Sequence, residues 1–175
     1  MKAYLTLMRD QSAEYTVQKS RFIGRAAPVH STEEALAFLD AVRQEHRTAN
    51  HHCYAYIIGQ NAGVMRYSDD GEPGGTAGMP IMEVLRVRGV VDCAVVVTRY
   101  FGGVLLGTGG LVRAYSHTCA LALNAAGICE MRAASYCGES CSAIAAETPL
   151  CGSAVNGKVL LSLKDRYVVL PLHVT

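Results

Sequence analysis

Residues 90–113 read VVDCAVVVTRYFGGVLLGTGGLVR and predict a strand, a loop and the start of a helix in succession. Val90–Thr98 is almost wholly apolar, a pattern typical of a strand that is covered on both faces. Five glycines follow between positions 102 and 110. Such clusters indicate backbone with positive φ or in close approach to another group. Apolar residues at helical spacing then predict a helix over Leu111–Ala125.

Upstream of this stretch, the sequence predicts first a strand and then a helix. Tyr15–Val29 has a strand-like pattern of residues. Ser31 and Glu34 form the S-x-x-E pattern of a capping box. Apolar residues at helical spacing follow this box, so we expect a helix that ends near Glu45.

Between that helix and residue 90, the sequence predicts a hairpin, a loop and a short helix. His52–Gly59 is rich in aromatic and β-branched residues, and Val64–Ser68 is its expected hairpin partner. The glycine-rich stretch Ser68–Gly78 is expected to be a loop. Pro80 suits the first turn of a helix that Gly89 would end.

The length and composition exclude several classes of protein. The 175 residues are 50% hydrophobic and 18% charged, with 16 Lys+Arg, 15 Asp+Glu and a net charge of +1. This predicts one compact domain, alone or with a small appendage, and excludes a disordered chain or a general polyelectrolyte binder. Any nucleic-acid contact therefore needs a local patch. No apolar run approaches the ~18 residues of a membrane span, and the first residues do not resemble a signal peptide, so we expect a cytoplasmic protein without a membrane partner.

Seven cysteines, an odd number without secretory features, predict reduced thiols. Cys93 and Cys119 lie in apolar patterns and are expected to be buried. Cys137, Cys141 and Cys151 could hold a metal ion, but they form no CxxC motif and have no nearby histidine. We therefore expect no metal site.

Ser68–Gly78 reads SDDGEPGGTAG and is the first candidate site, because three carboxylates fall within four residues. Asp69, Asp70 and Glu72 could bind a cation, contact a partner or work as an acid–base pair. Alternatively, the segment is a tight turn, since Asp, Gly and Pro all favour turns. Crowded carboxylates repel one another, so a basic partner is expected nearby, with Arg99 or Arg113 as candidates.

The second candidate site is an anion site where the glycine loop meets the predicted helix. Free backbone N–H groups and the positive helix end favour an anion there, and flanking arginines could bind phosphate. The spacing fits neither a Walker A loop nor a dinucleotide-binding fingerprint, and close helix–strand packing is the alternative explanation of the glycines. The predicted anion-binding residues are Arg99, Gly102, Gly103, Gly107, Gly109, Gly110 and Arg113.

The third candidate site is His51-His52-Cys53. On a strand, His51 and Cys53 share a face, so they could begin a zinc site or form a Cys/His nucleophilic pair. The alternative is a set of partly buried, hydrogen-bonded histidines. We also expect His51 to be a possible contact for a partner or an ion, together with Asp69, Asp70 and Glu72.

Three long motifs resemble the signature of the IMPACT/YigZ family. They are ANHHCYAYIIG (49–59), SDDGEPGGTAGMPIMEVL (68–85) and VVVTRYFGGVLLGTGGLVRAYS (95–116), with SRFIG (20–24) in addition. The resemblance implies an α+β fold for residues 1–128, with the βαβ-rich arrangement of a ribosomal-protein domain and a mixed or antiparallel sheet packed by helices. Members usually carry a second, ferredoxin-like domain. Residues 129–175, in which only 158–174 look strand-forming, are expected to be a short, diverged or truncated form of it.

The resemblance also implies a link to translation. Eukaryotic members are translation regulators that compete for a ribosome-associated activator of a stress-responsive kinase, and a role in nucleic-acid or ribosome binding is proposed for bacterial members. We therefore expect a non-enzymatic module, without cofactor or catalytic residues, that binds the ribosome, RNA or a translation-associated protein through the two glycine loops. An alternative is an enzyme for a small phosphorylated or acyl substrate, with the glycine loop as anion site and the SDDGE carboxylates as base or metal ligands. A third is a purely protein-binding module that uses the acidic loop.

Overall fold

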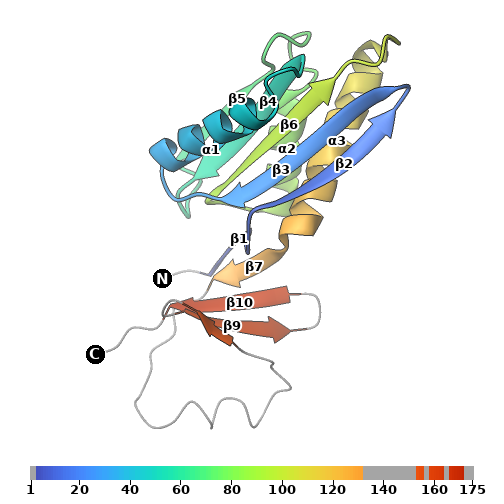
Figure 1. Ribbon diagram of the computed structural model, residues 1–175. Coiled ribbons are helices and arrows are strands. Elements are labelled where there is room, and N and C mark those ends of the chain that lie inside the picture. The colour runs from blue at the N-terminus through green and yellow to red at the C-terminus, as the bar shows by residue number, and fades with distance from the viewer. Residues whose placement is uncertain (1–2, 132–152, 156–157, 164–165, 172–175) are drawn as a thin grey trace, which may run out of the picture.

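A five-stranded antiparallel sheet with helices on both faces forms the larger part of the fold (Figure 1). The computed structural model describes residues 3–131, 153–155, 158–163 and 166–171. The strand order is β2 (Gln11–Val17), β3 (Ser20–Pro28), β6 (Cys93–Tyr100), β4 (His51–Ile58) and β5 (Val64–Ser68). Helix α1 (Thr32–Glu45) covers one face, and α2 (Gly78–Arg88) and α3 (Gly107–Ala126) cover the other. The architecture is α+β, as the family resemblance implies.

The central strand β6 explains why its sequence is apolar at nearly every position. Val95 and Val97 belong to the core between the sheet and helices α2 and α3. Ala94 and Val96 point to the opposite face and pack in the clusters beneath α1. The predicted strand with two covered faces is confirmed, although it begins at Cys93 rather than Val90 because Asp92 takes a φ of 51°.

The predicted strand Tyr15–Val29 is wrong as one element, since the chain reverses in its middle. Strand β2 ends at Val17 and β3 begins at Ser20, and these two residues are partners in the antiparallel register. Gln18 and Lys19 form the turn with φ values of 45° and 66°, as a type I′ hairpin turn requires. Neither is glycine, asparagine or aspartate, so the sequence carries no turn signal at this point.

The ends of the helices follow local chemistry. The Ser31 side chain accepts a hydrogen bond from the Glu34 backbone N–H at 3.2 Å, which confirms the predicted cap of α1. Gly89 adopts a left-handed conformation with a φ of 65° and ends α2, also as predicted. Helix α3 differs from the prediction, because it begins at Gly107 rather than Leu111. Three of the predicted loop glycines therefore lie in its first turn, where the backbone N–H groups have no acceptor within the helix.

A second sheet joins the two ends of the chain. Its order is β1 (Tyr4–Leu7), β7 (Ile128–Met131), β10 (Arg166–Pro171), β9 (Lys158–Leu163) and β8 (Ser153–Val155). Strands β7 and β10 are parallel, and the other neighbours are antiparallel. The division into residues 1–128 and 129–175 stays a prediction. Strand β1 lies in the first of these ranges and pairs with β7, which begins at Ile128 and therefore spans the predicted boundary.

Two further predictions concern the cysteines and the membrane. Cys93 and Cys119 are fully buried, as predicted, and so are Cys53 and Cys129. Cys137, Cys141 and Cys151 lie outside the residues that the structure describes. Within the described residues, no helix has the length and apolar character needed to cross a membrane.

Candidate anion-binding site and the buried network beside it

Asp69, the first carboxylate of the acidic loop, holds the start of α2. One of its oxygens accepts the backbone N–H groups of Ala77 and Gly78 at 3.0 and 2.8 Å, and the other accepts that of Gly75 at 2.9 Å. Ala77, the residue at the helix start, has no side chain that could do this. A negatively charged carboxylate at this position also interacts favourably with the positive end of the helix dipole. Asp69 therefore acts as a cap supplied from outside the helix.

Glu72 forms a buried ion pair with Arg99, at the end of β6. The Arg99 Nη1 donates to Glu72 Oε1 at 2.6 Å, and the side chains are only 7% and 3% exposed. The Tyr115 hydroxyl of α3 donates to the same oxygen at 2.7 Å. The expected basic partner is thus Arg99 and not Arg113. The pair ties the acidic loop, the central strand and α3 together.

The Arg99 guanidinium lies between two aromatic rings. Its carbon is 5.5 Å from the ring centre of Phe22 and 5.4 Å from that of Phe101. The Nε atom is buried and has no hydrogen-bond partner among the described residues. The guanidinium thus combines cation–π contacts to two rings with an ion pair through Nη1.

The histidine pair and Asp70 hydrogen-bond within the fold. His51 Nδ1 lies 2.8 Å from the Asp70 carbonyl oxygen, and the His52 backbone N–H donates to the Asp70 carboxylate at 2.6 Å. His52 Nε2 lies 3.1 Å from the His46 carbonyl oxygen. Burial lowers the pKa of His52, which favours the neutral imidazole. The interpretation as partly buried, hydrogen-bonded histidines is confirmed.

Cys53 shares this environment and is not an activated thiol. Its Sγ donates to the Asp69 carbonyl oxygen at 3.0 Å, and its side chain is fully buried. Burial raises the pKa of the Cys53 thiol to about 12, so the thiol is protonated at neutral pH. Burial likewise raises the pKa of the neighbouring Tyr115 hydroxyl, which donates to Glu72 as a neutral phenol. The described residues contain no group of three acidic, histidine or cysteine side chains placed to hold a metal ion.

The loop over residues 101–106, between β6 and α3, is the more accessible of the two glycine loops. Phe101 is 44% exposed and Leu105 is 84% exposed. Gly102 lies against the turn between β2 and β3, and a side chain there would overlap the Lys19 carbonyl group. Gly103 has a φ of 83°, which L side chains rarely adopt. These two glycines therefore shape the loop.

The first turn of α3 has exposed backbone and an arginine beside it. Leu106 precedes the helix and supplies no side-chain cap, and the sequence of α3 contains no carboxylate. A side chain on Gly109 would meet only Arg113 Nη1, at 3.9 Å, so the guanidinium lies along this turn. Unpaired N–H groups, the helix dipole and the arginine thus bring positive charge to one place.

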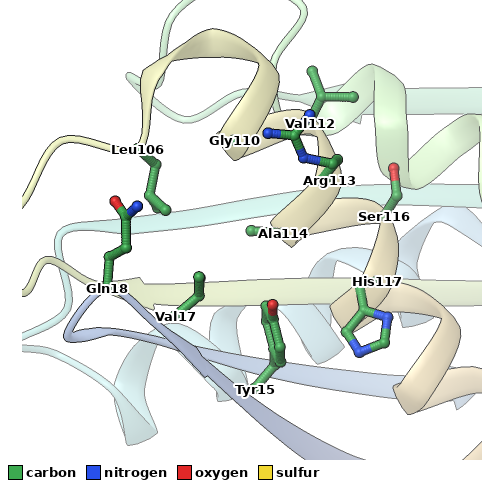
Figure 2. Close-up of a pocket in the computed structure, with 10 residues that line it drawn as sticks. All are labelled: Tyr15, Val17, Gln18, Leu106, Gly110, Val112, Arg113, Ala114, Ser116 and His117. Atoms are coloured by element: carbon green, nitrogen blue, oxygen red, sulfur yellow. The ribbon is translucent and has the colours of Figure 1, made fainter.

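A cavity of about 650 Å³ lies between this turn and the edge strand β2 (Figure 2). Among the residues that the structure describes, its lining contains one arginine and one histidine but no carboxylate: Tyr15, Val17, Gln18, Leu106, Gly110, Val112, Arg113, Ala114, Ser116 and His117. In Figure 2, Gln18 and Leu106 lie at one end of the cavity, and Tyr15 and His117 lie beside each other farther along it. We call this cavity the β2–α3 pocket.

The predicted anion-binding residues fall in three places. Gly107, Gly109, Gly110 and Arg113 belong to the first two turns of α3, Gly102 and Gly103 to the loop, and Arg99 to the buried network. The predicted site residues do not include three residues of the pocket lining: Tyr15, Gln18 and His117. For His117 a signal was available, because Gly110, Arg113 and His117 are spaced to lie on one face of a helix. For Tyr15 and Gln18 there was none, since their place depends on the unpredicted hairpin turn.

Residues 18–123 match the model of the Impact N-terminal domain. The chain belongs to the IMPACT family. It is 42% identical to the IMPACT family member YvyE of Bacillus subtilis over 132 residues, which cover 75% of this chain and 61% of that protein. It is 50% identical to the IMPACT family member YigZ of Escherichia coli over 101 residues, which cover 57% of this chain and 50% of that protein. This IMPACT-family chain therefore spans about half to three fifths of the length of these relatives.

The fold of the IMPACT-family chain also resembles a solved structure. A crystal structure described as that of a hypothetical protein has a TM-score of 0.69 and 40% sequence identity. The likeness covers 74% of this chain and 64% of the other. Among eukaryotic relatives, the chain is 36% identical to the Protein IMPACT homolog of Saccharomyces cerevisiae over 95 residues, which cover 53% of this chain and 37% of that protein.

Proposed function

We propose that this IMPACT-family chain is a non-catalytic, translation-linked module that binds RNA through the β2–α3 pocket and the first turn of α3. The observation that carries the proposal is the local charge. Arg113 and the uncapped helix start adjoin a pocket whose lining holds no carboxylate, and phosphate groups favour such surroundings. The link to translation rests on the resemblance to IMPACT-family regulators.

The balanced charge of the chain limits the size of the RNA contact. A net charge of +1 is not that of a general polyelectrolyte binder, so the proposed footprint is a few phosphates at one patch. Binding rather than catalysis is proposed because Asp69, Glu72 and Cys53 are engaged within the fold. Gly109 leaves room for the RNA backbone at the first turn of α3, and the Arg99 side chain packs beside Phe101 at the start of the preceding loop.

We expect Arg113→Gln to weaken binding of a 12-nucleotide single-stranded RNA about tenfold, because a charged hydrogen bond to phosphate is lost. The slope of log K against log salt should also become shallower by about 0.7, the value for one phosphate on a single strand. Fluorescence anisotropy between 50 and 200 mM KCl, in the range over which such contacts respond, measures both quantities.

Arg88→Gln is the matched control, since Arg88 is an exposed arginine on α2 outside the pocket. It changes the net charge equally and should leave the affinity within about twofold. Equal effects of the two substitutions would contradict a specific site. Inorganic phosphate is added as a competitor of the labelled RNA. If phosphate competes as strongly as unlabelled RNA, the site binds a small molecule instead.

Gly109→Asp should separate stability from binding. Position 109 is the third residue of α3, where a carboxylate favours the helix dipole and any side chain improves on glycine. We expect the free energy of unfolding to rise by about 1 kcal/mol, while RNA affinity falls at least about tenfold through repulsion at the phosphate site. Gly109→Ala controls for the added side chain and should retain binding. If the two variants bind RNA equally well, the first turn of α3 is not the anion site.

A further inference from the structure

We infer that the β2–α3 pocket accepts an unpaired nucleotide, with its phosphate at Arg113 and its base against Tyr15 and His117. This inference rests on the proposed function and names the form of RNA that the site takes. The inference is based on the part of the pocket that extends from Arg113 to Tyr15 and His117. A site that binds only phosphate would not need this part.

The aromatic pair is the first observation. The rings of Tyr15 and His117 lie edge to face, with their centres 4.7 Å apart and an angle of 68° between their planes. Tyr15 comes from the edge strand β2 and is half-buried, and His117 comes from α3 and is exposed. An edge-to-face pair leaves ring surface available to a third planar group, which a parallel stack would cover more fully. Bases stack on such side chains in a way that tolerates any sequence.

The spacing along α3 is the second observation. Arg113 and His117 are four residues apart on one face of the helix, a rise of about 6 Å. The Arg113 guanidinium folds back toward Gly109, away from the aromatic pair. The positive group and the rings are thus separated along the pocket, as the phosphate and the base are within one nucleotide.

Uncommitted polar side chains are the third observation. Gln18 and Ser116 line the pocket, and neither side chain forms a hydrogen bond within the described part of the chain. An amide and a hydroxyl each both donate and accept hydrogen bonds, so they can meet the edge of any base. The volume of about 650 Å³ lies within the range of small-ligand pockets.

The other large groove of the described fold lacks these features. It has a volume of about 590 Å³ and lies beside β2, β3 and the end of α1. Its two arginines are already paired: Arg21 with Glu14 at 2.8 Å, and Arg25 with Asp10 and Glu45 at 2.7 and 2.8 Å. The β2–α3 pocket combines an aromatic wall with Arg113, which forms no ion pair with any residue that the structure describes.

The test compares a 12-nucleotide oligouridine with a blunt 12-base-pair RNA duplex by fluorescence anisotropy. Paired bases cannot reach an aromatic wall, so wild-type protein should bind the single strand at least about fivefold more tightly, the lower end of what base–aromatic stacking provides. Tyr15→Leu, which keeps apolar bulk for packing, should lose this preference and leave duplex binding unchanged. Tyr15→Phe should retain it. Tyr67→Leu removes an exposed aromatic side chain of β5 outside the pocket and is the matched control.

The outcomes separate the two proposals. If single strand and duplex bind equally and Tyr15→Leu has no effect, while Arg113→Gln still weakens both, the nucleotide inference is overturned and phosphate binding stands. If Arg113→Gln has no effect on either RNA, both proposals fail. Competition by uridine monophosphate as strong as that by the oligomer would overturn the assignment to RNA. Thermal unfolding of Tyr15→Leu checks that a loss of binding is not a loss of fold.

Discussion

Replacing Glu72 with alanine is expected to lower the free energy of unfolding by about 3–5 kcal/mol, the usual effect of removing one member of a buried ion pair. The Arg99 side chain is only 7% exposed, so its charge would remain in the interior without a counter-ion. Tyr115 would lose the acceptor of its hydroxyl at the same time. Urea denaturation, followed by circular dichroism, measures the change.

The control for this prediction is Glu83→Ala. Glu83 pairs with Arg86 on the surface of α2 at 2.8 Å, with side chains 51% and 59% exposed, and such pairs contribute no more than about 1 kcal/mol. Glu72→Gln keeps an acceptor for both Arg99 and Tyr115 and should be less destabilising than alanine, which gives a folded variant to measure if Glu72→Ala does not fold. A loss no larger for Glu72→Ala than for Glu83→Ala would show that the buried pair is not important for stability.

Gly102→Ala should destabilise the protein by roughly 3 kcal/mol, the upper end of the usual effect of overpacking. The added methyl group would overlap the Lys19 carbonyl group in the turn between β2 and β3. The two strands that flank this turn are paired up to Val17 and Ser20, which restricts how far the turn can shift. The loop over residues 101–106 must therefore move away, and the hydrogen bond from the Gly102 N–H to Ser20 Oγ, at 3.2 Å, would be lost.

Gly74→Ala is the matched control for Gly102→Ala. No heavy atom lies within 4 Å of the position that its added methyl group would occupy, and its φ is not in the left-handed region. The free energy of unfolding should change by less than about 0.5 kcal/mol. Equal stability of the two variants in thermal unfolding would mean that the loop does not pack closely against the β2–β3 turn.

These glycines show how far a local pattern can be interpreted. The cluster over residues 102–110 left two explanations open, close packing or anion binding, and the structure assigns close packing to Gly102. At Gly109, by contrast, an added side chain would meet only the Arg113 guanidinium. Glycines of one motif thus have different roles. Only the residues that surround each glycine in the folded protein show which role it has.

The candidate site was less predictable than the fold. The crowded carboxylates of the acidic loop predicted a basic partner, and the sequence could not distinguish between Arg99 and Arg113. Arg99 is the penultimate residue of the central strand and pairs with Glu72, whereas Arg113 lies on the exposed surface of α3. Tyr15 and His117 meet across about a hundred residues because β2 turns back along β3 and α3 crosses both strands. No local signal indicates that contact.

Elements whose causes are local could be predicted from the sequence. The two-sided burial of β6, the cap of α1, the β4–β5 hairpin and the glycine end of α2 each follow from residues close together in the chain. The tertiary structure alone decided which charges pair, which carboxylate caps α2 and which side chains enclose the β2–α3 pocket. The physical reason is that periodicity and capping act over a few residues, whereas ion pairs and pockets depend on the order of the strands and on the faces that the helices cover.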